Sequence, residues 1–124
     1  MYFVMEKNIC LVDSWAKDIA KRDSILMTNY YSEDSILLAT FENLLEGKSG
    51  VKKYFDSFLS KEGLECEILD KYYLVNTETL QVCSGTYKFN YISDGNTKEV
   101  FARFTFVFKN HKIVTHHSSV NPEL

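Results

Sequence analysis

Hydrophobic residues recur at helical spacing in the first half of the chain and at strand spacing in the second half. Between residues 9 and 20, apolar side chains follow one another at steps of three and four with charged residues between them, which predicts an amphipathic helix. Asp23 can cap a second, shorter helix through about Tyr31, because its carboxylate accepts from the free N–H groups of a first turn. The run VKKYFDSFL (51–59) repeats the helical spacing, and SILLATF (35–41) predicts a short strand between these helices.

From Leu64 onward the apolar period shortens from about 3.6 to about 2, and β-branched and aromatic residues dominate. The runs are broken at NTET, SDGN and KNHK. Within them, Asp94-Gly95 and Asn110-His111 suit tight turns, because each pair offers a residue that tolerates positive φ. We predict about four long antiparallel strands after the helices. Residues 1–124 would then form one α+β domain, in which a bent sheet wraps the helices and leaves a cone-shaped interior.

The strand VFARFTFVF has apolar side chains on both faces. Side chains alternate along a strand, which separates Phe104, Phe106 and Phe108 from Phe101, Arg103, Thr105 and Val107. A sheet that is covered on one face only should alternate apolar with polar residues. We therefore expect the second face to meet another copy of the chain, in a homodimer or a larger ring.

Charge and composition exclude several classes of partner. The net charge is −3 and the lysines are scattered, whereas nucleic-acid binding needs a basic stripe. No basic leader with an apolar run begins the chain, and no window approaches the roughly 20 apolar residues that span a bilayer, so we expect a soluble, cytoplasmic protein without membrane contact. The three cysteines are widely spaced and form no C-x-x-C pair, which predicts buried reduced thiols rather than disulfides or zinc.

Arg103 and the closing strand contain the candidate chemistry. The guanidinium of Arg103 cannot lose its proton, so a buried Arg103 would need an internal carboxylate or an anionic ligand as partner. An exposed edge position is the third possibility, and all three remain open. In the closing strand, alternation puts Thr115, His117 and Ser119 on one face, which we expect to face the pocket, and His116 and Ser118 on the other, which we expect to face a partner subunit or solvent. The two histidines therefore cannot share a site, and we expect no metal.

A general base in the interior is the alternative source of chemistry. Imidazole titrates near neutral pH, and a hydrophobic wall can raise the pKa of a carboxylate. Asp18, Asp34 and Glu42 lie near the predicted mouth of the cone. Each of them is also explained as a helix cap or as a solvated side chain.

The order of these segments resembles a known superfamily. Trp15 in the opening helix is followed by YYSEDSILLATF, EGKSGVKKYFDSFL, SGTYKFNY, ARFTFVFK and IVTHHSSVNPE, and together they resemble the nuclear transport factor 2-like (NTF2-like) superfamily. Within it, the chain is most similar to the association domain of calcium/calmodulin-dependent protein kinase II and its stand-alone bacterial relatives, which overlap the SnoaL-like group. The resemblance covers nearly the whole chain.

The resemblance implies an NTF2-like (cystatin-like) cone-shaped barrel that assembles through the outer face of its sheet and has a deep pocket in each subunit. By position, Arg103 matches a pocket arginine and His117 the second histidine of the kinase-type ending, and we add Thr115, Tyr87 and Trp15 to the expected pocket. Lys88 and Ser118 stand where the kinase domain has arginines, which implies a less basic pocket. No kinase domain and no basic amphipathic helix is present, so we expect neither phosphoryl transfer nor calmodulin binding.

Two functions follow as expectations. The first is a non-catalytic, homo-oligomerising domain whose pocket binds a small anionic or polar metabolite without a cofactor. The alternative is an enzyme similar to SnoaL cyclases or ketosteroid isomerases, with a pocket general base that acts on a small apolar substrate without a metal.

Overall fold

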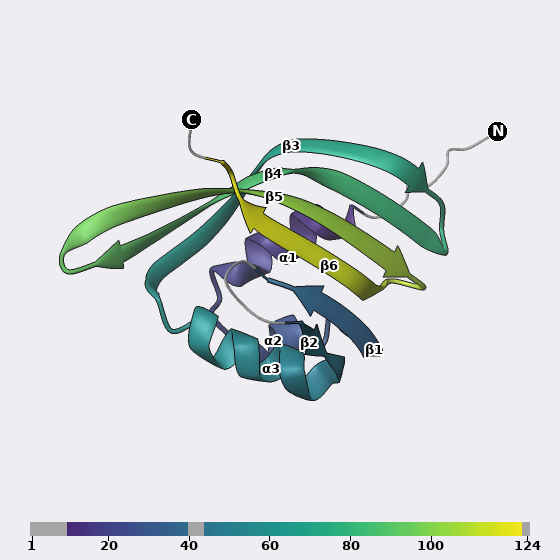
Figure 1. The fold of residues 1–124 in the computed structure, drawn as a ribbon, viewed down its shortest axis with the longest axis horizontal. Coiled ribbons are helices and arrows are strands. Elements are labelled where there is room, and N and C mark those ends of the chain that lie inside the picture. The colour runs from purple at the N-terminus through teal and green to yellow at the C-terminus, as the bar shows by residue number, and fades with distance from the viewer. Residues whose placement is uncertain (1–9, 40–43, 123–124) are drawn as a thin grey trace.

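The computed structural model describes residues 10–39 and 44–122, which form three helices and a six-stranded sheet (Figure 1). The predicted helices and long strands are present. The first strand starts at Tyr31 rather than at residue 35, and residues 40 and 41 of the predicted strand lie outside the described residues. The elements are α1 (Leu11–Ile19), α2 (Ser24–Thr28), β1 (Tyr31–Leu38), β2 (Leu45–Glu46), α3 (Gly47–Phe58), β3 (Glu62–Asn76), β4 (Leu80–Ser93), β5 (Asn96–Lys109) and β6 (Lys112–Val120).

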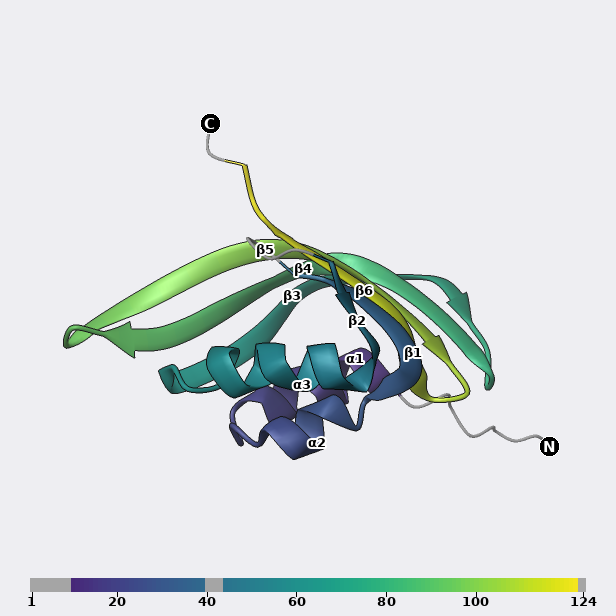
Figure 2. The ribbon, with the colours of Figure 1, turned by 60° about the horizontal axis from the view of Figure 1, so that its bottom comes forward.

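The sheet is strongly curved, and the helices lie on its concave side (Figure 2). The strand order is β2-β1-β6-β5-β4-β3. Neighbouring strands are antiparallel except β1 and β6, which run parallel. The architecture is the α+β arrangement that the order of periodicities predicted, with an additional two-residue strand, β2, at the edge of the sheet.

Local sequence signals explain where several elements begin and turn. The Asp23 carboxylate accepts from the backbone N–H groups of Ile25 and Leu26, and so caps α2 as expected. The β4–β5 turn contains Asp94 and Gly95 at positive φ, and the β5–β6 turn contains two further residues at positive φ, Asn110 and His111. Both predicted turn pairs are therefore confirmed.

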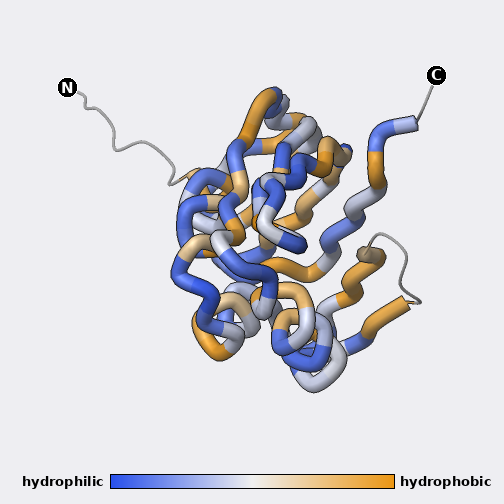
Figure 3. Tube along the Cα trace, turned by 90° about the vertical axis from the view of Figure 1, so that its left-hand side faces the viewer, coloured by the Kyte–Doolittle hydropathy of each residue, from blue (hydrophilic) through white to orange (hydrophobic). Residues whose placement is uncertain are grey.

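The core lies between the helices and the concave face of the sheet. Val12, Trp15 and Ile19 of α1 are buried there, as are Val51 and Phe55 of α3. The three phenylalanines of β5 expected on one face, Phe104, Phe106 and Phe108, are buried against these helices. Hydrophobic and hydrophilic stretches are interspersed along the strands (Figure 3). Burial of each large apolar side chain stabilises the fold by roughly 1.5–3 kcal/mol, which fixes the phenylalanine face of β5 as the inner one.

A bulge in β6 determines which of its side chains face the core. Ile113 pairs with Phe108, but Thr115 pairs with Val107, so Val114 is an extra residue in the ladder. After this bulge, His116 lies opposite Phe106, on the inner face. A bulge of one residue thus shifts the alternation of the rest of the strand.

The structure also tests what the sequence predicted for the cysteines and for membrane-spanning helices. All three thiols are free, as expected, but only Cys83 is fully buried, whereas Cys10 and Cys66 are half-buried. In the part of the chain that the structure describes, no helix has the length and apolar character needed to cross a membrane.

Candidate functional site

A pocket of about 630 Å³ lies between α3, α1 and the concave face of the sheet. This volume is within the range of about 300–1,000 Å³ typical of small-molecule sites. Seven of its eighteen lining residues are aromatic: Trp15, Tyr54, Phe55, Phe58, Tyr87, Phe89 and Tyr91. Its polar side chains include Lys53, Ser57, Lys61, His116 and Ser118. The pocket therefore offers an apolar space with a small number of polar groups.

The aromatic rings of the inner wall hold His116 in a fixed position. Its imidazole stacks on the ring of Phe106 at a centroid distance of 4.0 Å, and the Trp15 indole meets it edge-on at 5.3 Å. Trp15 also stacks on Tyr87 at 5.9 Å. His116 is 3% exposed, so this packing leaves the imidazole little contact with water.

A chain of hydrogen bonds passes through this histidine to the pocket. The indole Nε1 of Trp15 donates to the Tyr31 hydroxyl at 3.2 Å, and that hydroxyl lies 2.8 Å from Nδ1 of His116. On the other side of the ring, Nε2 of His116 lies 3.2 Å from the Tyr87 hydroxyl, which donates to Oγ of Ser118 at 2.6 Å. We call these five residues the hydrogen-bond chain.

The protonation of His116 gives the hydrogen-bond chain one direction. Burial, with a smaller contribution from His117, lowers the pKa of His116 from 6.5 to about 3, so the imidazole is neutral at pH 7 and has one donor and one acceptor. Tyr87 gives its proton to Ser118, so Nε2 must be the nitrogen that donates to Tyr87. Nδ1 then accepts from Tyr31. Burial also raises the pKa of both tyrosines well above the usual value, which keeps them neutral.

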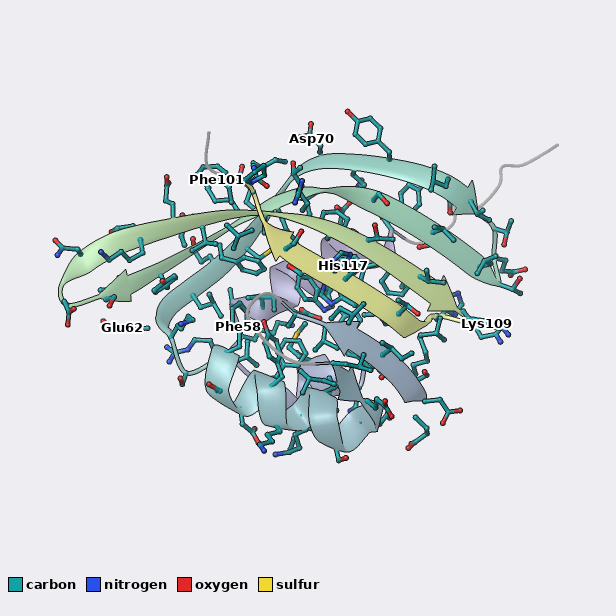
Figure 4. The ribbon with its side chains drawn as sticks, viewed as in Figure 1. Phe58, Glu62, Asp70, Phe101, Lys109 and His117 are labelled. Carbon is teal, nitrogen blue, oxygen red and sulfur yellow. The ribbon has the colours of Figure 1, made fainter. Side chains whose placement is uncertain are left out.

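Of the five predicted pocket residues, Trp15 and Tyr87 line the pocket, whereas Arg103, Thr115 and His117 do not. The prediction that Arg103 and His117 face inward is wrong. Both are exposed on the convex side of the sheet, and Figure 4 labels His117 on β6. Arg103 lies on the outer face of β5, because the phenylalanines of this strand occupy the inner face. His117 lies opposite Thr105 on that same outer face.

The residues expected to face outward, His116 and Ser118, instead provide the polar groups of the inner wall. Sequence reasoning missed this because the bulge at Val114 changes the phase of β6. It also missed Lys53 and Lys61, although a signal was present. Lys53, Ser57 and Lys61 follow one another at steps of four, the spacing of one helix face.

Neither of the two candidate carboxylates that the structure describes, Asp18 and Asp34, lies on the pocket wall. Asp18 accepts from the Tyr30 hydroxyl at 2.7 Å and pairs with Lys21 at 3.1 Å. Asp34 is exposed on β1, and Glu42 lies outside the described residues. Over residues 10–39 and 44–122, the pocket lining contains no carboxylate, and no group of three His, Cys, Asp or Glu side chains is placed to hold a metal.

Comparison with known proteins agrees with this architecture. The family model described as "calcium/calmodulin dependent protein kinase II association domain" matches residues 6–122. No curated protein sequence shows a significant match. A crystal structure from Xanthomonas campestris, provisionally named a calcium/calmodulin-dependent protein kinase II association domain, is similar with 25% identity and a TM-score of 0.83, and the match covers 100% of both chains.

Two further crystal structures share the fold at low identity. An NTF2-like protein with a cystatin-like fold from Novosphingobium aromaticivorans has 9% identity and a TM-score of 0.75, and the match covers 92% of this chain and 79% of that one. A provisionally named dehydratase of the NTF2-like family from Streptomyces avermitilis has 13% identity and a TM-score of 0.79, with 91% and 93% covered. The fold is therefore NTF2-like, as the sequence resemblance implied.

Proposed function

Because the chain belongs to the calcium/calmodulin-dependent protein kinase II association domain family, we propose that it is a homo-oligomerising NTF2-like domain whose pocket binds a small anionic or polar ligand without converting it. The observation that carries the proposal is the pocket itself: a space of about 630 Å³ with aromatic walls and a few polar groups. Pockets of this kind suit small organic molecules, which the apolar walls hold and the polar groups orient.

The state of His116 supports binding rather than catalysis. An efficient general base has a pKa near the working pH, and the pKa of His116 is lowered to about 3. Both ring nitrogens also lie within hydrogen-bond distance of buried tyrosine hydroxyls. The described pocket lining offers no carboxylate as a substitute base.

The convex face of the sheet supports self-association. No described helix covers this face (Figure 2), and it presents exposed apolar side chains from β1, β3 and β5. These are Ile36, Leu38, Tyr72, Leu74 and Phe101, which are between 38% and 72% exposed. An uncovered sheet face with large exposed apolar side chains is typical of surfaces that bind another protein, and the family name supports another copy of this chain as that protein.

Native mass spectrometry of the gently purified protein tests both parts of the proposal. We expect a dimer or larger ring that carries a discrete small-molecule adduct. Ala102 lines the pocket, so Ala102→Phe should fill it and remove the adduct. Arg103→Ala is the matched control, because Arg103 is the next residue on the same strand but faces outward, and it should keep the adduct.

Other results of this experiment would contradict the proposal. A stable monomer at micromolar concentration would count against self-association. An adduct that survives in folded Ala102→Phe but disappears in Arg103→Ala would place the ligand on the convex face. No adduct, with no thermal stabilisation by a panel of small carboxylates at millimolar concentration, would contradict ligand binding.

An enzyme similar to SnoaL cyclases or ketosteroid isomerases is the second candidate. The hydrogen-bond chain favours it, because a histidine connected to the pocket through Tyr87 and Ser118 could pass a proton to a substrate. Screening apolar carbonyl compounds for turnover tests this candidate. His116→Gln should abolish any activity found, and full activity in that variant would remove His116 from the mechanism.

A further inference from the structure

We infer that the ligand has two different polar ends on a flat apolar body: a neutral hydrogen-bond acceptor, such as a ketone, bound by Ser118, and an anionic group, such as a carboxylate, bound by Lys53 and Lys61. The inference rests on the proposed function and adds the chemical class and the orientation of the ligand. Its grounds are the direction of the hydrogen-bond chain and the positions of the two lysines on the pocket wall.

The inner end of the pocket presents a donor. Each group in the hydrogen-bond chain donates to the next, from the Trp15 indole to the Ser118 oxygen. The Ser118 hydroxyl accepts from Tyr87, so its own proton is left to donate. No described residue accepts that proton, and Ser118 lines the pocket. A ligand acceptor at this position would therefore pair with the donor proton that the hydrogen-bond chain leaves free.

This acceptor should be neutral rather than charged. Ser118 is half-buried and lies near the buried His116, and a charge in such surroundings is costly unless a counterion or several hydrogen bonds stabilise it. The inner end offers one serine proton beside an uncharged imidazole, and the described lysines of the lining come from α3 and from its C-terminal side. A ketone or ester carbonyl meets these conditions, whereas a carboxylate at the same position would lack a counterion.

The lysines of the lining supply positive charge at a different place. Lys53 is exposed on α3, and Lys61, just after this helix, is half-buried with its Nζ 4.7 Å from the centroid of the Tyr91 ring. Neither ammonium makes an ion pair with a described carboxylate, whereas the neighbouring Lys52 pairs with Asp56 at 3.0 Å. These two lysines of the lining, without a described counterion, are where the inference places the anionic group of the ligand.

The wall between these ends suits a flat body. Tyr54 and Phe58 of α3 stack on each other at 5.4 Å, and Trp15 of α1 stacks on Tyr87 of β4 at 5.9 Å. Aromatic walls favour planar ligands, because ring faces and edges pack well against one another. A benzene ring with an acceptor at one end and a carboxylate at the other is the simplest molecule of this class.

Three matched probes test the inference by isothermal titration calorimetry on the full chain. 4-Acetylbenzoate has both ends, 4-isopropylbenzoate lacks the acceptor, and 4-methylacetophenone lacks the anion. We expect 4-acetylbenzoate to bind most tightly, by about 3- to 10-fold over each of the other two, the effect of one hydrogen bond or one partly exposed charge contact.

Variants assign each end to its residues. Ser118→Ala should remove the preference for 4-acetylbenzoate over 4-isopropylbenzoate, while Ser119→Ala, one residue further and on the outer face, should keep it. A double variant, Lys53→Gln with Lys61→Gln, should remove the preference for 4-acetylbenzoate over 4-methylacetophenone. Lys52→Gln on the same helix does not touch the pocket lining and should behave as wild type.

Some results overturn the inference without touching the proposed function. Equal affinity for the three probes, or a preference that both Ser118→Ala and the double lysine variant retain, would show that these residues do not select the ligand. If no probe binds, this ligand class is wrong. The co-purified adduct and the Ala102→Phe variant then decide separately whether the pocket binds any ligand.

Discussion

Acidification should destabilise the protein through the buried imidazole of His116. The pKa of His116 is about 3 in the folded chain and 6.5 for an unperturbed imidazole. Between these two values the unfolded chain binds a proton at this position and the folded chain does not. Stability therefore rises with pH in this window. The contribution is fully present above pH 6.5 and is lost as the pH falls from 6.5 toward 3.

The size of the effect follows from the shift. Each pH unit between the two pKa values costs about 1.4 kcal/mol, so at pH 4.5 the folded state should lose roughly 3 kcal/mol relative to pH 7. Domains of this kind have a total stability of about 5–15 kcal/mol. The lowered pKa of His116 alone should thus remove a large fraction of the total stability, at a pH where most carboxylates are still ionised.

Urea unfolding at pH 7 and pH 4.5, at one fixed protein concentration, measures the loss. Carboxylates such as Asp13, whose pKa the structure also lowers, add their own acid sensitivity, so the informative quantity is the difference between variants. His116→Gln cannot titrate and should lose roughly 3 kcal/mol less than wild type. His117→Gln, at the exposed neighbour, should follow wild type. Equal losses in wild type and His116→Gln would refute the assignment of a buried, neutral histidine.

Three further substitutions have defined outcomes. Tyr31→Phe leaves the indole donor and the imidazole acceptor of the hydrogen-bond chain unpaired, so thermal unfolding should show a loss of about 2–4 kcal/mol, whereas Tyr72→Phe, 66% exposed, should stay within about 0.5 kcal/mol. Gly85→Ala would force a Cβ onto a backbone carbonyl of β3 and should unfold at much lower urea concentration, while Gly50→Ala in α3 meets only ordinary contacts and should be neutral or slightly stabilising. Asp23→Ala removes the cap of α2 and should cost about 1 kcal/mol.

The sequence predicted the elements where local patterning and tertiary packing agree. The helical periods of α1 and α3 and the alternation in β5 each place apolar residues toward one core, and the structure buries those residues. The start of β1 was missed because YSED, its first four residues, has no apolar alternation. Pairing with the neighbouring strands holds this segment in the sheet, and tertiary pairing commonly overrides local propensity.

The error at the site has a single physical origin in β6. Ile113 is buried, so strict alternation from it would place Thr115 and His117 inside. The bulge at Val114 inserts one residue and inverts every later position. Such a bulge depends on how β5 and β6 pair. The residues of β6 alone therefore do not predict it.

Arg103 and His117 do lie on one face of the sheet, but this face is the convex one. Which side of the sheet that face occupies depends on the phenylalanines of β5, whose burial outweighs any gain from placing an arginine inside. The outward position of Arg103 also changes the charge of the pocket. With Arg103 outside and His116 neutral, the positive charge of the described lining comes from Lys53 and Lys61, so an anionic ligand group should bind at these lysines rather than at the inner wall.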